Sequence, residues 1–250
     1  MMVLDSFKMN HKKDEKTVKY DVLIFDLDDT LFDFGETEKH ALDNSFRAFS
    51  FPNGLTEYRA SYKEISKGLW LDLEQGRISL SDLKVERFKR LFLQHKLLLN
   101  PEDFGHAYIE NLGREVHMID GVQDMLTNLS SCRLVLLTNG FQDVQHSRIA
   151  LSPLNQTFEA IITSEESGYQ KPQAEIFEYV FRKLSIKDKQ SVLMIGDSLT
   201  ADIQGGNNFG IDTCWFNPHN KANETTITPT YEISNYEELE QIVKQNVLVK

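Results

Sequence analysis

The sequence VKYDVLIFDLDDT, residues 18–30, determines the fold class. We expect residues 18–27 to form a strand, because the unbroken run of apolar side chains at 22–25 is typical of a strand buried on both faces of a parallel sheet. The strand runs directly into an acidic cluster. Because ligands of open α/β sheets bind outside the carboxyl ends of the strands, this cluster is the first candidate for a functional site.

Further short apolar runs follow Gly121, and helical stretches separate them. These runs are CRLVLLTNG (132–140), AIITSE (160–165), SVLMIGDS (191–198) and TCWFN (213–217). Such alternation predicts βαβ crossovers, and hence an α/β fold with a mainly parallel sheet flanked by helices. Polar clusters end three of the strands, at 26–30, 138–140 and 196–198, and we expect them to converge at one edge of the sheet.

Residues 34–112 show helical periodicity and no convincing strand, which predicts an inserted α-helical region. Ser79 with Asp82 resembles a capping pair, and Asn100 followed by Pro101 is a second helix start. The core is then formed by residues 17–33 and 113–250. Residues 1–16 are polar and lysine-rich, and we expect them to be a flexible extension.

Composition limits the classes of partner. The formal net charge of −11 argues against a broad surface for a nucleic-acid polymer or an anionic membrane. Cys132 and Cys214 belong to no C-x-x-C pair, so we expect two reduced thiols. No segment approaches about 18–20 continuous apolar residues and no signal peptide is evident, so we expect a cytoplasmic protein. The oligomeric state stays open.

Asp26 and Asp28 form a carboxylate pair at the end of the first strand. Residues two apart in an extended chain project to the same face, so both carboxylates can reach one substrate. Our hypothesis is that one carboxylate attacks phosphorus in its ionised form while the other carries a proton. The second role requires a raised pKa, and repulsion from neighbouring carboxylates is one available cause. A solvated acidic turn is the alternative, but these acids follow a buried strand. Leu31 stands where a calcium loop requires glycine, which excludes an EF-hand.

Thr138 and Asn139 offer a hydroxyl, an amide and backbone N–H groups that are able to hold a phosphoryl oxygen. An ordinary strand-to-helix turn explains the same residues. Lys171 precedes Pro172, which we place at or near the first position of a helix. There Lys171 is either a surface charge or the group that neutralises both an attacking carboxylate and a phosphate.

Asp197 and Asp202 add two acids after the run VLMIG. They either cap the helix that follows or bind a metal. Four acids around one phosphate would repel it unless a cation intervened, and oxygen ligands of this kind suit Mg²⁺. The residues therefore point to Mg²⁺ as cofactor and to a small phosphorylated metabolite as partner.

In this order, the motifs DLDDT (26–30), TNG (138–140), KP (171–172) and GDSLTAD (196–202) resemble those of the haloacid dehalogenase superfamily. The resemblance spans roughly residues 18–217 and implies a Rossmann-like core with a helical cap. It implies that Asp26 is a nucleophile that becomes an aspartyl-phosphate, and that Asp28 is the acid and base. It also implies that Thr138 and Lys171 bind the phosphate. The Mg²⁺ ligands that it implies are Asp26, the Asp28 carbonyl and Asp197. Asp202 would contact Mg²⁺ through water or support the residues that bind it.

Two details indicate which branch of the superfamily the chain resembles. Dehalogenase members lack an acid at position 28 and sugar phosphomutases usually carry glycine at position 29, so the chain looks like a phosphatase. Residues 68–88, with DDTLFDF and TCWFN, are similar to bacterial pyrimidine 5′-nucleotidases that act on noncanonical nucleoside monophosphates. The alternatives are a sugar-phosphate or N-acylneuraminate-phosphate phosphatase, a noncatalytic binding protein of the same fold, and a dehalogenase. Trp70 could stack on a base, although a lone aromatic on an apolar helix face is more often part of a core.

Overall fold

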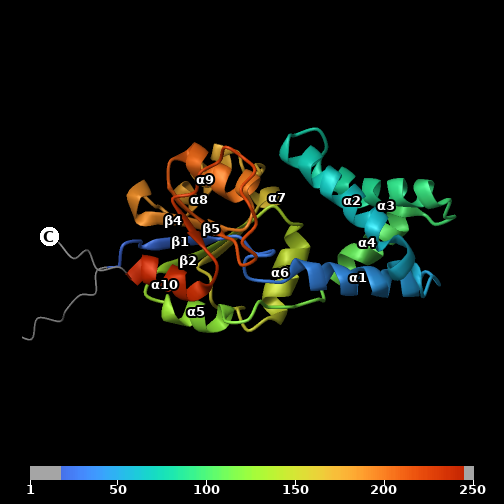
Figure 1. Cartoon of the computed structure of the whole chain (residues 1–250), viewed down its shortest axis with the longest axis horizontal. Coiled ribbons are helices and arrows are strands. Elements are labelled where there is room, and N and C mark those ends of the chain that lie inside the picture. The colour runs from blue at the N-terminus through green and yellow to red at the C-terminus, as the bar shows by residue number, and fades with distance from the viewer. Residues whose placement is uncertain (1–17, 245–250) are drawn as a thin grey trace, which may run out of the picture.

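Six parallel strands form the centre of the larger of the two bodies seen in Figure 1. The computed structural model describes residues 18–244, so the predicted extension at 1–16 lies outside the described residues. The strand order is β3-β2-β1-β4-β5-β6, which confirms the predicted α/β fold. The strands are β1 (Val22–Phe25), β2 (Arg133–Thr138), β3 (Ala160–Thr163), β4 (Val192–Gly196), β5 (Asp212–Phe216) and β6 (Tyr231–Ile233).

Helices cover both faces of the sheet. Leu23 and Phe25 of β1 pack in a cluster with α5 (Val122–Asn128) and α10 (Tyr236–Lys244). Their neighbours Val22 and Ile24 face the opposite cluster, to which α8 (Ala174–Lys183) and α9 (Gln204–Phe209) contribute. This alternation follows from the two-residue period of a strand and explains why the run at 22–25 is apolar throughout. Two more helices, α6 (Gln142–Leu151) and α7 (Ser164–Ser167), follow β2 and β3.

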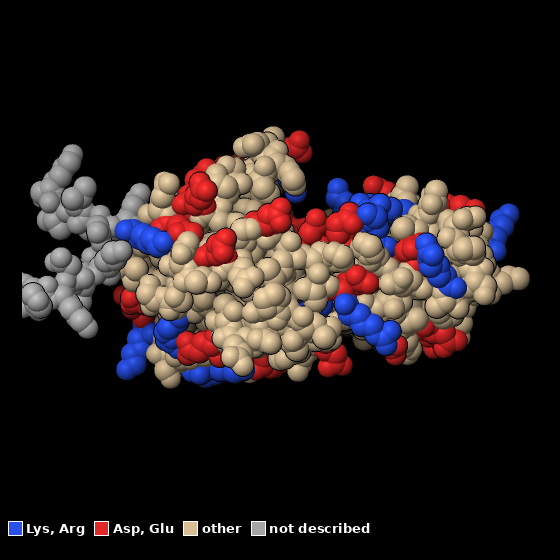
Figure 2. Space-filling view, turned by 90° about the horizontal axis from the view of Figure 1, so that it is seen from below, with Lys and Arg blue, Asp and Glu red and all other residues tan. Residues whose placement is uncertain are grey.

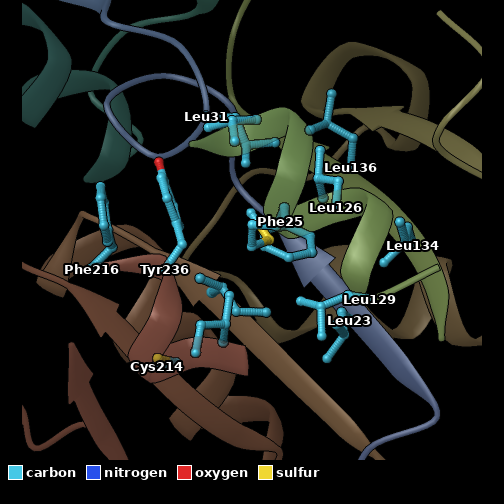
Figure 3. Packing of buried hydrophobic residues seen from close by; sticks show 14 of the residues in the cluster. Leu23, Phe25, Leu31, Leu126, Leu129, Leu134, Leu136, Cys214, Phe216 and Tyr236 are labelled. Atoms are coloured by element: carbon cyan, nitrogen blue, oxygen red, sulfur yellow. The ribbon is translucent and has the colours of Figure 1, made fainter. Parts of the chain in front are cut away.

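The C-terminal helix α10 fixes the loop that follows β1. The Tyr236 ring stacks on Phe216 with ring centroids 4.8 Å apart, and the Tyr236 hydroxyl donates a 2.7 Å hydrogen bond to the Thr30 carbonyl. Figure 3 shows the Tyr236 hydroxyl pointing away from the cluster toward this loop. The loop that carries Asp28 is thus held from a segment about two hundred residues later in the sequence.

Four helices follow β1 in the sequence, before the chain returns to the core. In space they form a lobe beside the core (Figure 1). They are α1 (Phe34–Ala48), α2 (Gly54–Glu74), α3 (Leu80–His95) and α4 (Pro101–Leu112). Ser79 and Asp82 make the expected capping box, and the Asn100 side chain caps α4 with Pro101 in its first turn. The lobe has its own aromatic cluster, which includes Phe88 and Phe104. The division of the chain into core and cap stays a prediction.

The surface carries charges of both signs. On the face shown in Figure 2, acidic and basic side chains of the described residues are interspersed and form no continuous basic patch. Within residues 18–244, no helix combines the length and the apolar character needed to cross a bilayer.

Candidate active site

A cavity of about 280 Å³ lies between the carboxyl ends of the strands and the helical lobe. The chain passes from β1 to β2 and β3 on one side and to β4, β5 and β6 on the other, so the cavity lies at the topological switch point. The structure brings together every residue that the sequence suggested for the site. The cavity is lined by Asp26, Asp28, Thr138, Asn139, Lys171, Asp197 and Asp202, together with Trp70, Glu74 and Arg87 from the lobe.

Lys171 occupies the centre of the charged part of the site. Its fully buried ammonium donates to Asp26 Oδ1 at 2.6 Å, to Asp202 Oδ1 at 2.7 Å and to the Leu137 carbonyl at 2.8 Å. Burial alone would lower the pKa of Lys171, but the carboxylates of Asp202 and Asp26 outweigh it and raise this pKa. Lys171 is therefore a permanent cation between two carboxylates.

The Asn139 side chain positions Lys171. Its amide donates to the Lys171 carbonyl and accepts from the Lys171 N–H, both at 2.9 Å. Both polar atoms of the Asn139 side-chain amide thus bond to the backbone of Lys171. For a phosphoryl oxygen, the backbone N–H of Asn139 is a better candidate than its side chain. Pro172 lies just before α8 rather than in its first turn, because Gln173 is the N-cap, and the Lys171–Pro172 bond is cis.

Three acids are close enough to share one cation. Carboxylate oxygens of Asp26, Asp197 and Asp202 all lie within 4.8 Å of one another. Burial raises the pKa of Asp26 to about 7, against the lowering effect of Lys171, and Asp202 and Asp28 add repulsion. Burial, followed by the charges of Asp202 and Asp26, raises the pKa of Asp197 well above its ordinary value. A buried set of carboxylate oxygens with one ammonium among them is short of positive charge, and it fits Mg²⁺.

A π-helical turn over Leu199–Ile203 places Asp202 in this group. The Ser198 N–H donates to Asp202 Oδ2 at 3.0 Å, while Oδ1 accepts from Lys171. Gly196 ends β4 directly against this carboxylate, and a Cβ atom at position 196 would overlap it. Asp202 therefore acts on Lys171 and on the turn, whereas Asp197 has no such partner among the hydrogen bonds of residues 18–244.

Asp28 is held by two side chains that the sequence did not reveal. Arg148 Nη1 donates to Asp28 Oδ1 at 2.6 Å, and Gln145 Nε2 donates to Asp28 Oδ2 at 2.8 Å. Repulsion from neighbouring carboxylates was the one influence on Asp28 that the sequence suggested, and the structure adds a guanidinium from α6. Arg148 is fully buried and also donates to Thr37 Oγ1 of α1 at 3.2 Å. The signal in the sequence was Gln145 and Arg148 three residues apart on the helix after TNG, a spacing that places both on one face.

Thr138 closes the other side of the site. Its oxygen accepts from the Gly140 N–H and from Gln145 Nε2, each at 3.0 Å. Because both contacts use the oxygen as an acceptor, the hydroxyl hydrogen is left to donate into the cavity.

The lobe contributes its own polar groups. Glu74, at the end of α2, accepts a 3.1 Å hydrogen bond from Thr200 of the core. Burial raises the pKa of Glu74, and this hydrogen bond opposes the shift. Glu74 and Arg87 both lie within residues 68–88, the segment that is similar to pyrimidine 5′-nucleotidases, but nothing in that segment singles them out. The folded lobe shows that they line the cavity.

The chain belongs to the haloacid dehalogenase-like hydrolase family, whose model matches residues 23–216. Its fold and the acids at its strand ends agree with this membership, and the predicted resemblance is confirmed.

The chain is similar to two pyrimidine 5′-nucleotidases and to one magnesium-bound crystal structure. The chain is 38% identical over 233 residues to the pyrimidine 5′-nucleotidase PynA of Streptococcus pneumoniae, covering 92% of this chain and 98% of that one. It is 31% identical over 227 residues to the pyrimidine 5′-nucleotidase YjjG of Escherichia coli, with 90% and 99% covered. The crystal structure of the HAD-hydrolase YfnB of Bacillus subtilis bound to magnesium matches with a TM-score of 0.84 at 38% identity, covering 90% of this chain and 99% of that one.

Proposed function

We propose that this protein is a Mg²⁺-dependent phosphomonoesterase that acts on pyrimidine nucleoside 5′-monophosphates. The observation that carries the proposal is the buried Lys171 ammonium, which joins Asp26 to Asp202 at the edge of a cavity. The matches to PynA and YjjG support the substrate class, and the magnesium-bound YfnB structure supports the metal.

Asp26 is the nucleophile in this proposal. Lys171 holds Oδ1, so the second carboxylate oxygen is left to form the bond to phosphorus. The ester oxygen leaves as this bond forms and takes a proton from Asp28. Asp28 then takes a proton from the water that attacks the aspartyl-phosphate, and the Asp26 carboxylate is released with inorganic phosphate.

The other residues hold the phosphoryl group and shape the proton transfer. The Thr138 hydroxyl donates to a phosphoryl oxygen. The three N–H groups of the Lys171 ammonium already donate to Asp26, Asp202 and the Leu137 carbonyl, so one of these hydrogen bonds is exchanged when Lys171 donates to the phosphoryl group. Both carboxyl oxygens of Asp28 accept one hydrogen bond each in the structure, and each keeps a second lone pair on which Asp28 can carry the proton.

Asp26, Asp197 and the Asp28 carbonyl would hold Mg²⁺ directly, with Asp202 supporting Lys171 and the metal indirectly. Bound there, Mg²⁺ would supply the positive charge that lets three carboxylates and a phosphate dianion share one cavity.

The first prediction tests the nucleophile. We expect Asp26→Asn to lose phosphate release from UMP by about 10³-fold or more, because an amide oxygen cannot form the acyl-phosphate. The matched control is Asp120→Asn, since Asp120 is exposed and outside the cavity. Full activity in Asp26→Asn with Mg²⁺ would contradict the mechanism.

A substrate panel tests the second half of the proposal. We expect wild-type protein with Mg²⁺ to release phosphate from pyrimidine nucleoside monophosphates with a higher kcat/KM than from hexose phosphates or N-acylneuraminate 9-phosphate. The reverse order would leave the phosphatase intact and overturn the nucleotidase.

A further inference from the structure

Arg87 is a buried cation that the proposed chemistry does not use. It lies on α3, is 1% exposed and lines the same cavity as the acids. Nε donates to the Leu83 carbonyl at 2.9 Å and Nη1 donates to the Tyr62 hydroxyl at 3.1 Å. Within residues 18–244, Nη2 has no hydrogen-bond partner. A buried donor without an acceptor is destabilising, so a small rotation of the guanidinium that brings Nη2 to a ligand oxygen in the cavity would be favourable.

The surroundings of Arg87 favour a neutral acceptor over an anion. The guanidinium lies 5.6 Å from the ring centre of Tyr108 and 6.0 Å from that of Trp70, and both ring faces offer it negative potential. The acid Glu38 lies close enough to influence Arg87 electrostatically, and Glu74 lines the cavity. A second anionic group on the substrate would meet these acids, whereas a carbonyl oxygen would not be repelled.

The apolar lining of the cavity also suits a flat ring. Trp70, Phe34 and Leu112 line the cavity from three different helices of the lobe. A planar base that packs against these aromatic and aliphatic side chains binds more favourably than a polyhydroxylated sugar would, because the sugar would bury hydroxyl groups against apolar surface.

We propose that Arg87 determines specificity: its Nη2 donates a hydrogen bond to a carbonyl oxygen of the pyrimidine base while Trp70 packs against the ring. This assignment rests on the proposed nucleotidase function and names the residue that reads the base. The hydrogen bonds of Arg87 go to Leu83 and Tyr62 of the lobe and not to Asp26, Asp28 or Lys171, so we expect its effect on discrimination between substrates.

The test compares UMP with ribose 5-phosphate, which keeps the phosphate and sugar and lacks the base. In Arg87→Met, we expect the ratio of kcat/KM for UMP to kcat/KM for ribose 5-phosphate to fall by about 10–100-fold relative to wild type. The control is Arg90→Met on the same helix, where the exposed Arg90 pairs with Glu86 and the ratio should not change. An unchanged ratio in Arg87→Met, or no preference for UMP in wild type, overturns the assignment. Failure of wild type to hydrolyse either substrate overturns the proposed function instead.

A second measurement needs no variant at the buried position. We expect wild-type kcat/KM to be at least about tenfold lower for a phenyl C-nucleoside 5′-monophosphate, which keeps a flat six-membered ring but has no carbonyl, than for UMP. Equal values would overturn the hydrogen bond to the base.

Discussion

Lys171 is a buried cation that is paired with two carboxylates of the site. It is buried, and it offsets the repulsion between Asp26 and Asp202, which lie on different segments. Removing one partner of a buried ion pair leaves the other charge desolvated and unpaired. The contribution of Lys171 to stability should therefore depend on whether its carboxylate partners are ionised.

Lys171→Met is predicted to destabilise the metal-free protein by about 3–5 kcal/mol at pH 8. Burial raises the pKa of Asp26 to about 7 even with Lys171 opposing the shift, so the variant should raise it further. A folded-state pKa above the unfolded value means that the folded state binds the proton more tightly. The variant should therefore regain stability as the pH falls through 7 toward 5.

Urea unfolding in EDTA at pH 8 and pH 5 measures this difference. Lys89→Met, at an exposed position of α3, should stay within about 0.5 kcal/mol of wild type at both pH values. If Lys171→Met lost the same free energy of unfolding at pH 8 and at pH 5, the ionised carboxylates would not be the cause of the loss.

At the scale of elements, α6 joins the two halves of the molecule. Val144 packs in the aromatic cluster of the lobe, and Ile149 packs in the cluster on one face of the sheet. Between them, Gln145 and Arg148 hold Asp28. A shift of α6 against either cluster would therefore move the acid and base of the proposed reaction.

Two glycines in different elements should respond oppositely to a methyl group. Gly196→Ala should cost about 1–3 kcal/mol and reduce activity, because the new Cβ overlaps the Asp202 carboxylate at the end of β4. Gly68→Ala should stabilise by about 0.5–1 kcal/mol, because Gly68 is exposed within α2 and its Cβ would meet nothing within 4 Å. Thermal unfolding of the two variants checks both signs, and equal stability would refute the overlap at Gly196.

The sequence predicted the elements whose signal is local. The apolar run of β1, the capping box at Ser79 and the acids after β1 and β4 are all visible within a few residues. The three-residue β6 was missed because so short a run has no detectable period.

The partners of the site residues could not be predicted. Arg148 meets Asp28 across 120 positions of sequence, and Arg87 reaches the cavity only because α2 and α3 pack as they do. Such contacts depend on how whole helices are placed, and no local pattern of side chains reports that placement.

At the scale of the whole molecule, the proposed metal site connects parts of the chain that are far apart in sequence. Asp26 follows β1, Asp197 follows β4, and Asp202 lies in the π-helical turn. A ligand that binds only the folded state stabilises the entire fold. The stabilisation should also compete with protons on Asp26 and Asp197, since carboxylates must be ionised to bind a cation.

Mg²⁺ should therefore raise the Tm more at pH 8 than at pH 6, because Asp26, with a pKa of about 7, is mostly protonated at the lower pH. Asp197→Asn should remove most of the shift, and Asp120→Asn should keep it. Scanning fluorimetry with and without Mg²⁺ makes the measurement. A shift that is independent of pH, or that survives in Asp197→Asn, would place the cation elsewhere.

The position of β1 in the middle of the sheet has a consequence for synthesis of the chain. β1 pairs with β2 on one edge and with β4 on the other, and β4 begins only at Val192. At ribosomal speeds of about 5–20 residues per second, the nascent chain waits roughly 10–30 s for that second partner. Until β2 is made, both edges of this entirely apolar strand are unpaired, and the edge that β4 covers stays unpaired to the end of the interval. The unpaired edge is a target for chaperones or for aggregation. Slow translation between residues 26 and 191 would lengthen that exposure and lower the yield of folded enzyme.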